Sequence, residues 1–389
     1  MYRELPITAG GPDPRIGPRG LPTWYRLRDL RIASNLVLAP MEGVTDLVFR
    51  RLIRGIGGAG YTCTEFIASE GLKRGGSSKM ARMAQFDPDE RPVCVQIFGR
   101  RPAVMAEAAR IVEDMGASIV DINMGCPSKN VVANSGGSAL MKDPLLAGQI
   151  VRAVRAAVAV PLTVKMRAGF SASQRNAPEI AHICQEEGAE ALAVHWRTRA
   201  DRYKGRRVVD KIAETVDAVD VPVLANGDVV DIPSAEAMLR ETGAAGLMIG
   251  RGAIRNPWLM LQIGQWLRGE VPVSVDAAEK KRAMLRYFRT IAEALPRERV
   301  ALGRMKMLTG HFTRGLPFGA GLRVLFLRSQ TREEAEQWVH RYFDCLQAYE
   351  AGDSKAFDAS PFHVPPDPGA PAQSRSQGPR QLVTLSPPP

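Results

Sequence analysis

No long apolar run occurs in this sequence. A helix that crosses a bilayer needs about 18 or more consecutive apolar residues, and none of the hydrophobic stretches in these 389 residues approaches that length. The first twenty residues also lack the apolar core and small-residue cleavage site of a secretory signal. We therefore expect no membrane segment and a cytoplasmic location.

Cysteines are few and widely spaced. The five thiols, at Cys63, Cys94, Cys126, Cys184 and Cys345, form no C-x-x-C pair, and their number is odd. This pattern argues against both a disulfide framework and a zinc site. We expect reduced thiols and no bound metal, with Cys94 and Cys184 buried as small hydrophobic residues in their predicted strand and helix, an interpretation that could extend to Cys63.

Acidic residues are scarce in one part of the chain. Residues 278–328 hold twelve basic and three acidic residues, a net charge of +9, while the whole chain carries +11. A single basic helix is usually a solvated face, but a concentrated basic surface attracts phosphate backbones or anionic membranes. Because no membrane anchor accompanies it, this segment favours nucleic acid as a partner.

Short runs rich in Val, Ile and Leu are what the sequence does contain, and each is followed by a segment with helical spacing. The runs fall at 35–40, 61–66, 93–99, 118–125, 162–167, 191–196, 221–228 and 246–252. Eight strands alternating with helices over this length predict an α/β fold of the (β/α)8 TIM barrel type. The amphipathic pattern after Gly269 predicts a small all-helical C-terminal domain.

The predicted organisation has four parts. A flexible lead-in spans 1–23, a TIM barrel catalytic domain spans 24–270, and a helical domain spans 277–350. From Asp353 onward Pro, Ser, Gly and Gln dominate, so we expect 353–389 to be a disordered tail that can be removed without harm. Nothing in the pattern predicts an obligate protein partner.

Polar residues cluster at the carboxyl ends of the predicted strands. A polar side chain in a strand buried on both faces is costly unless it is paired or used, and in a β/α barrel these strand ends meet at one mouth. We therefore predict a single active site there. The strand ends contribute Pro40 and Met41, Glu65, Gln96, Asn123 with Cys126, Lys165 with Arg167, His195, Asn226 with Asp228, and Gly250 with Arg251.

Three of these features indicate particular chemistry. Gly250 and Arg251 precede a helix start and offer a phosphate cradle, although a tight turn would look the same. Lys165 could stabilise an anion such as a reduced flavin. Gln96 could bond a ring amide or could be a satisfied amide of the barrel rim.

Cys126 stands on a Gly-Cys-Pro turn just past a strand end, where its sulfur can face the barrel mouth. A thiol with a pKa near 8.5 is mostly protonated at neutral pH, which suits a proton donor, while a neighbouring cation would make it a nucleophile. Both roles require exposure. This turn is a poor place to bury a thiol.

From Asn35 to Arg328 the sequence resembles the tRNA-dihydrouridine synthases of the bacterial B type. The motifs "LAPMEGVTDLVFR", "VQIFG", "DINMGCPSKNVV", "VKMRAG", "LANGDV" and "MIGRGAIRNPW" occur in the family's order and spacing. The resemblance implies an FMN-binding barrel, NADPH as reductant, and a helical domain that binds tRNA. It implies flavin contacts from Pro40, Met41, Glu42, Gln96, Lys165, His195, Asn226, Gly227, Asp228, Gly250 and Arg251.

The resemblance also implies a mechanism, in which hydride passes from flavin nitrogen 5 to carbon 6 of a flipped-out uracil and Cys126 protonates carbon 5. We expect substrate contacts from Asn123, Arg167, Arg304, Lys306, Arg314 and Arg323. Three residues depart from the family pattern, namely Glu42, Asn130 and Trp196. Trp196 could stack on a ring, but we expect it to fill a wider rim.

Two other functions fit parts of the sequence. An FMN barrel dehydrogenase acting on a free pyrimidine or an enone would explain the barrel but not the basic helices. A tRNA-binding protein without chemistry would leave Cys126 and Lys165 unexplained.

Overall fold

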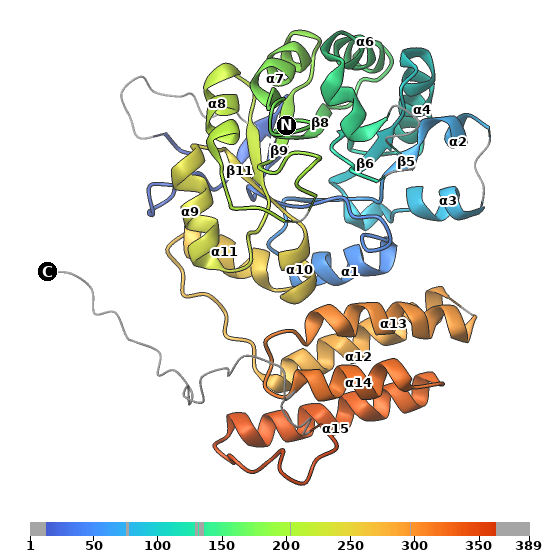
Figure 1. Ribbon diagram of the computed structural model, residues 1–389, viewed down its shortest axis with the longest axis vertical. Coiled ribbons are helices and arrows are strands. Elements are labelled where there is room, and N and C mark those ends of the chain that lie inside the picture. Colours follow the sequence, from blue (N-terminus) through green and yellow to red (C-terminus); the bar gives the residue numbers. More distant parts are fainter. Residues whose placement is uncertain are drawn as a thin grey trace, which may run out of the picture.

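The computed structural model describes residues 13–74, 78–128, 131, 136–202, 204–295 and 297–362. Figure 1 shows two parts, a barrel surrounded by helices and a separate layer of helices packed against one side of it.

Eight parallel strands form the barrel. They are β3 (Leu36–Leu38), β4 (Tyr61–Cys63), β6 (Val93–Phe98), β7 (Ile119–Met124), β8 (Leu162–Arg167), β9 (Ala191–His195), β10 (Val223–Asn226) and β11 (Gly246–Ile249). Strand β11 pairs with β3 and β4 pairs with β6, so the sheet closes on itself. A short additional strand, β5 (Ile67–Ala68), pairs with the end of β6. Every predicted run became a barrel strand, which confirms the predicted fold class.

Helices surround the barrel between the strands. They are α1 (Leu47–Ile56), α2 (Ser69–Lys73), α3 (Ser78–Ala84), α4 (Pro102–Asp114), α6 (Pro144–Arg155), α7 (Ala177–Glu186), α8 (Asp210–Ala218), α9 (Ile232–Thr242), α10 (Arg251–Arg255) and α11 (Leu259–Leu267), with short 3-10 helices η1 (Pro88–Glu90) and η2 (Gly137–Lys142). Asp46, Asp143 and Asp231 cap helix N-termini through their carboxylates, which satisfies amides that have no partner within the helix.

A β-hairpin that the sequence analysis did not predict closes one end of the barrel. Strands β1 (Tyr25–Leu27) and β2 (Leu30–Ile32) are antiparallel, and Tyr25, Leu27 and Ile32 are buried with the first residues of the barrel strands, such as Ile119 and Ala191. The hairpin therefore covers the end opposite the strands' carboxyl termini.

The predicted lead-in is ordered in its second half. Residue Ile16 forms a bridge with Pro22, and Leu21 is buried in the main core. A Cβ on Gly17 would lie 2.8 Å from the Leu267 carbonyl of α11, so this segment packs closely on the barrel because a glycine permits it. Residues 1–12 lie outside the described part of the chain.

In the described part of the C-terminal region there are four helices, and they confirm the predicted helical part. They are α12 (Ala277–Ala294), α13 (Glu298–Phe312), α14 (Gly319–Arg328) and α15 (Arg332–Glu350). Figure 1 shows this layer beside α1 and α10 of the barrel. Phe49 of α1 meets Tyr287 edge to face with ring centres 6.3 Å apart, so the two parts share one apolar core. None of the described helices is both long and apolar enough to cross a membrane.

The first part of the predicted disordered tail packs against the helices. Phe357 and Phe362 are 0% and 1% exposed, and Phe357 stacks on Phe318 with ring centres 4.3 Å apart. A Cβ on Gly321 would lie 2.1 Å from the Phe362 carbonyl, so α14 offers a glycine to seat this segment. Residues 353–362 therefore differ from the prediction, because two aromatic side chains anchor a polar stretch. Residues 363–389 lie outside the described part.

Candidate active site

One cavity of about 1070 Å³ opens at the carboxyl ends of the barrel strands. Nearly all of the predicted site residues line it, and the exceptions are Arg304, Lys306 and Arg323. The residues that it brings together are Pro40, Met41, Glu42, Gln96, Asn123, Cys126, Lys165, Arg167, His195, Asn226, Gly227, Asp228, Gly250, Arg251 and Arg314. Glu65, noted at a strand end, instead accepts a hydrogen bond from the Gly43 amide behind the cavity wall.

The Cys126 backbone is held on both sides. The side-chain oxygen Oδ1 of Asn123 accepts hydrogen bonds from the backbone amides of Gly125 at 3.0 Å and Cys126 at 2.9 Å. The Cys126 carbonyl accepts from the Ser138 hydroxyl at 2.8 Å. The backbone that carries the thiol is therefore held in place at the cavity wall, although it forms a turn.

The Cys126 thiol is part-buried, and burial is the main reason why its pKa lies above the ordinary value. The nearby charge of Glu42 raises the pKa further, whereas the Ser128 amide, Arg167 and Lys165 lower it. The thiol is therefore protonated at neutral pH, which is the state that a proton donor requires.

A buried network of polar side chains lies beneath the cavity. Gln96 donates to Asp121 at 2.6 Å and accepts from Asn123 at 2.8 Å. Thr163 donates to the other Asp121 oxygen at 2.5 Å. Burial raises the pKa of Asp121 to about 7 despite these donors. The network connects Asp121 through Gln96 to Asn123, and the Asn123 side chain holds the backbone of Cys126.

Lys165 projects from β8 and has no hydrogen-bond or ion-pair partner among the described residues. Burial lowers its pKa to about 8, Arg167 lowers it further, and Asp121 acts in the opposite direction. A lysine held near a cavity without a partner can stabilise negative charge on a bound molecule.

His195 is neutral and has a defined tautomer. Its pKa lies well below the ordinary value, first because it is buried and then because Lys165, Arg167, Arg197 and Arg251 are cationic neighbours. Its Nδ1 accepts a hydrogen bond from the Arg197 amide at 3.1 Å, so the ring proton belongs on Nε2. The ring can therefore act as a hydrogen-bond donor in the cavity.

Arg197 is a cavity residue that the sequence analysis missed. It is 5% exposed, its guanidinium lies 3.9 Å from the Trp196 ring centre, and it forms a 2.7 Å ion pair with Asp228. Its Nη1 is buried and has no hydrogen-bond partner among the residues that the structure describes. The sequence signal that could have identified Arg197 is its position two residues after His195, which ends a barrel strand.

Asp228 joins two arginines at the predicted phosphate cradle. It pairs with Arg251 at 2.7 Å as well as with Arg197. A Cβ on Gly227 would lie 2.6 Å from the Trp196 ring, so only glycine allows the backbone to pass here. Trp196 is 2% exposed and does not line the cavity, as expected for a residue that fills the rim.

Basic residues from both parts of the molecule surround the opening. Arg202, Arg251 and Arg255 of the barrel line it together with His311 and Arg314 of the helical region. Burial, followed by Arg314, Arg251 and Arg255, lowers the pKa of His311. The sequence analysis missed Arg202, Arg255 and His311. Arg255 lies one helical turn beyond Arg251, but no local pattern relates His311 to the barrel.

Comparison with known proteins assigns this chain to a family. The family model described as "Dihydrouridine synthase (Dus)" matches residues 37–347. This chain belongs to the dihydrouridine synthase family. It is 39% identical over 299 residues to a probable tRNA-dihydrouridine synthase of Rickettsia conorii, covering 77% of this chain and 90% of that protein.

A second relative supports the bacterial B type. The chain is 36% identical over 330 residues to tRNA-dihydrouridine synthase B of Pseudomonas aeruginosa, covering 85% of this chain and 95% of that protein. The dihydrouridine synthase family assignment supports tRNA-dihydrouridine synthase activity, and with it tRNA as the substrate.

Several residues expected to contact substrate in this dihydrouridine synthase have partners within the protein. Lys306 donates to the Ser329 carbonyl at 2.7 Å, and Arg323 donates to the Thr313 carbonyl at 3.1 Å. Arg304 forms an ion pair with Asp46. Arg167 lines the cavity, but it donates to the Gly125 carbonyl at 2.7 Å beside Cys126. Helical spacing alone could not reveal these partners.

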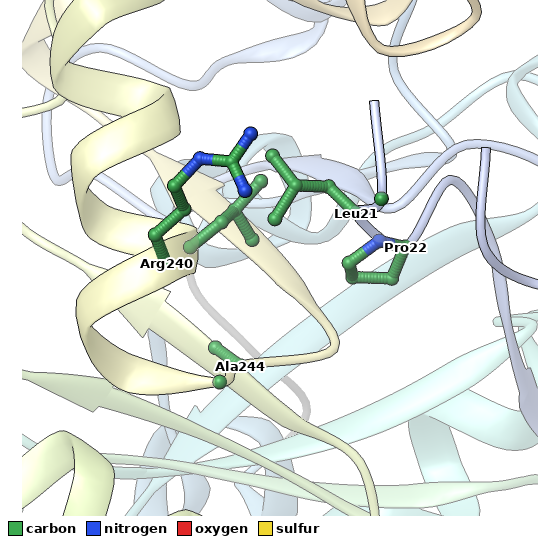
Figure 2. Close-up of a pocket in the computed structure, with 7 residues that line it drawn as sticks. Leu21, Pro22, Arg240 and Ala244 are labelled. Carbon is green, nitrogen blue, oxygen red and sulfur yellow. The ribbon is translucent and has the colours of Figure 1, made fainter. Parts of the chain in front are cut away.

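Two further features of this family member bear on the predictions. Asn130 lies outside the described residues. A smaller hollow of about 330 Å³, lined by Leu21, Pro22, Arg240 and Ala244 among others, lies between the lead-in and the end of α9 (Figure 2). It lacks the convergent polar groups of the main cavity, so it is not the active site.

Proposed function

We propose that this protein reduces uridines in tRNA to 5,6-dihydrouridine, with FMN as cofactor, NADPH as electron donor and Cys126 as proton donor. The observation that carries the proposal is the protonated, part-buried Cys126 thiol, which shares one cavity with Lys165, a cation that has no ion-pair partner in the described ranges. A proton donor and an anion-stabilising cation in the same cavity suit reduction of a ring double bond.

The cavity has the size and chemistry for FMN. Its volume of about 1070 Å³ reaches the upper end of the range of roughly 300–1000 Å³ for ligand pockets, which leaves room for a base beside a cofactor. Within the described part of the chain the buried Nη1 of Arg197 has no hydrogen-bond partner, and such a donor fits a phosphate oxygen.

We assign the residues that line this cavity to two groups. Arg197, Arg251 and the backbone from Gly250 would hold the phosphate group, with His195 as an additional neutral donor. Lys165 and Gln96 would face the flavin ring system, together with Pro40, Met41, Asn226 and Gly227. FMN held by these residues would supply a hydride for ring carbon 6 of uracil, with NADPH as the proposed source of its electrons.

Cys126 would deliver a proton to ring carbon 5 on the other side of the reduced bond. Asn123 and Ser138 fix the thiol through its backbone, and burial keeps it protonated until it is used. Arg167 would act indirectly, because it holds the Gly125 carbonyl next to the thiol.

A uridine in folded tRNA must leave its stack to enter such a cavity, at a cost of a few kcal/mol. The basic rim would offset this cost through phosphate contacts. Arg202, Arg255 and Arg314 have exposed side chains without partners among the described residues. Arg314 is thus kept from the sequence prediction, and Arg202 and Arg255 take the place of Arg304, Lys306 and Arg323 as our proposed RNA contacts.

The first test replaces the thiol. Cys126→Ala should reduce dihydrouridine formation about 10²- to 10⁴-fold, because a positioned general acid contributes a factor of that size. Flavin absorbance and tRNA affinity should remain unchanged. The control is Cys345→Ala, which removes a thiol on α15 far in sequence from the cavity and should leave turnover unaltered. Full activity of Cys126→Ala would remove the proposed role.

The second test concerns the RNA. Affinity for tRNA should fall steeply with salt, and Arg314→Met should lower the slope of log affinity against log salt by about one. A free-pyrimidine dehydrogenase would reduce a small substrate without saturable tRNA binding. A binding protein without chemistry would bind tRNA but purify without flavin absorbance.

A further inference from the structure

Arg304 links the helical region to the loop that forms one wall of the cavity. The loop 40–44 follows β3, and four of its five residues line the cavity. From α13, the Arg304 Nε donates to the Asp46 carboxylate at 3.0 Å, and its Nη2 binds the same oxygen. Its Nη1 donates to the Gly43 carbonyl. One side chain therefore bonds the loop and the N-cap residue of α1.

The Gly43 peptide is held from two sides. Its amide donates to the Glu65 carboxylate at 2.5 Å, and its carbonyl accepts from Arg304. Glu65 follows β4 and is 7% exposed, so it belongs to the barrel. Gly43 has a φ of 72°, a conformation that glycine adopts without strain. The turn is thus fixed between the barrel and the helical region.

The surroundings of Arg304 make these bonds matter. Its side chain is 19% exposed and that of Asp46 is 20% exposed, while Tyr287 of α12 is buried nearby. A charge pair that is shielded from water contributes more than a surface pair, and removing one partner leaves the other unsatisfied. Two turns beyond Arg304 on α13, His311 lines the cavity mouth.

We propose that Arg304 is a positioning residue, which holds the loop 40–44 beside Cys126 and makes the shape of the cavity depend on the docked helical region. The inference rests on the proposed function only in that both concern the same cavity. Arg304 then acts through Gly43 and Asp46 and does not contact RNA.

Access to Cys126 provides a test that needs neither flavin nor tRNA. In a Cys345→Ala background, Cys126 is the one cysteine that is not buried, so its alkylation by iodoacetamide can be followed by mass spectrometry. Arg304→Met should speed alkylation about three- to tenfold, because a released loop opens more often. Arg304→Lys should restore part of the protection.

Matched variants distinguish the contacts that Arg304 makes with Asp46 and Gly43 from a general effect of charge. Asp46→Asn keeps a good N-cap for α1 but loses the ion pair, so it should also speed alkylation. The double variant with Arg304→Met should add little, as expected for two halves of one interaction. The control, Arg286→Met, removes an exposed arginine of α12 and should leave the rate unchanged.

The salt dependence of tRNA binding gives the opposing outcome. If Arg304 positions the loop, Arg304→Met keeps the slope of the parent protein, whereas Arg314→Met reduces it by about one. Parent-like alkylation together with a reduced slope for Arg304→Met would overturn the proposal and make Arg304 an RNA contact. If Arg304→Met does not fold, Arg304→Lys and Asp46→Asn decide by the same rates. If the protein does not reduce tRNA but the alkylation rates are as expected, the result contradicts the proposed function and leaves the positioning role of Arg304 intact.

Discussion

At the scale of single residues, burial sets the protonation states around the cavity. Desolvation penalises the charged form of a group, so it raises the pKa of Cys126 and of Asp121 and lowers those of Lys165 and His195. The Cys126 thiol is therefore protonated, and the His195 imidazole is neutral. Each state follows from position in the fold and from the cations nearby.

The pKa of Asp121 leads to a prediction on stability. Burial raises it from 3.8 to about 7, so between these values the folded protein binds a proton that the unfolded chain has released. The free energy of unfolding should therefore fall as pH rises through this window and level off above it. Asp121→Asn should reduce the fall between pH 5 and pH 7.5 by about 2–3 kcal/mol, as measured by urea unfolding.

The control is a substitution of Thr163 that should raise the pKa of Asp121 further. Thr163 donates to Asp121 and holds its pKa down, so Thr163→Val should extend the fall to higher pH. Equal pH dependence in the parent and both variants would contradict the role of Asp121.

At the scale of elements, the turn after β7 depends on the glycine at the start of η2. Gly137 has a φ of 57°, and a Cβ there would lie 2.8 Å from the Val131 side chain and 3.0 Å from the Cys126 carbonyl. The helix is therefore seated directly beneath the thiol. A side chain at this position would strain the backbone and displace the turn.

We expect Gly137→Ala to reduce the free energy of unfolding by about 1–3 kcal/mol and to lower turnover more than flavin affinity. Urea unfolding, flavin titration and turnover measure the three effects. Gly55→Ala is the matched control, since it lies in α1 with open space around it, and it should stabilise the protein by up to about 1 kcal/mol. Unaltered turnover in Gly137→Ala would show that the Cys126 thiol does not depend on the close approach of Gly137.

At the scale of the whole molecule, the helical region and the barrel share one core. Trp258 of the barrel contacts Phe312 of α13 with ring centres 6.2 Å apart, and α12 packs on α1. Cutting the chain after Gly269 would expose these apolar faces. The RNA-binding role of the helices is therefore better tested by single charge changes in the full chain.

The ordered start of the tail gives a further prediction. Phe362→Ala should reduce the free energy of unfolding by about 3–5 kcal/mol, the usual effect for a buried aromatic residue, because Phe362 packs with Tyr342 and Trp338. A chain ending at Gly352 should lose this contribution together with that of Phe357. A chain ending at Phe362 should unfold at the same urea concentration as the full protein. Equal midpoints for both shortened chains would refute the anchor.

Much of the fold and of the candidate site was predictable from the sequence. Buried parallel strands read as continuous apolar runs, and the carboxyl ends of such strands converge on one mouth. Cys126, Lys165 and His195 could therefore be placed in one cavity from the sequence. The motifs then identified the family.

Only the tertiary structure decided how charged and aromatic residues distant in sequence are paired. Arg304 looks like an exposed cation on a basic helix, yet it binds Asp46. Phe362 stands in a polar tail, yet it is buried, and Arg197 acquires its orphaned donor only beside Asp228 and Trp196. The period of a strand or helix is a local property of the chain, whereas a partner across the fold exists only once the chain has closed around it.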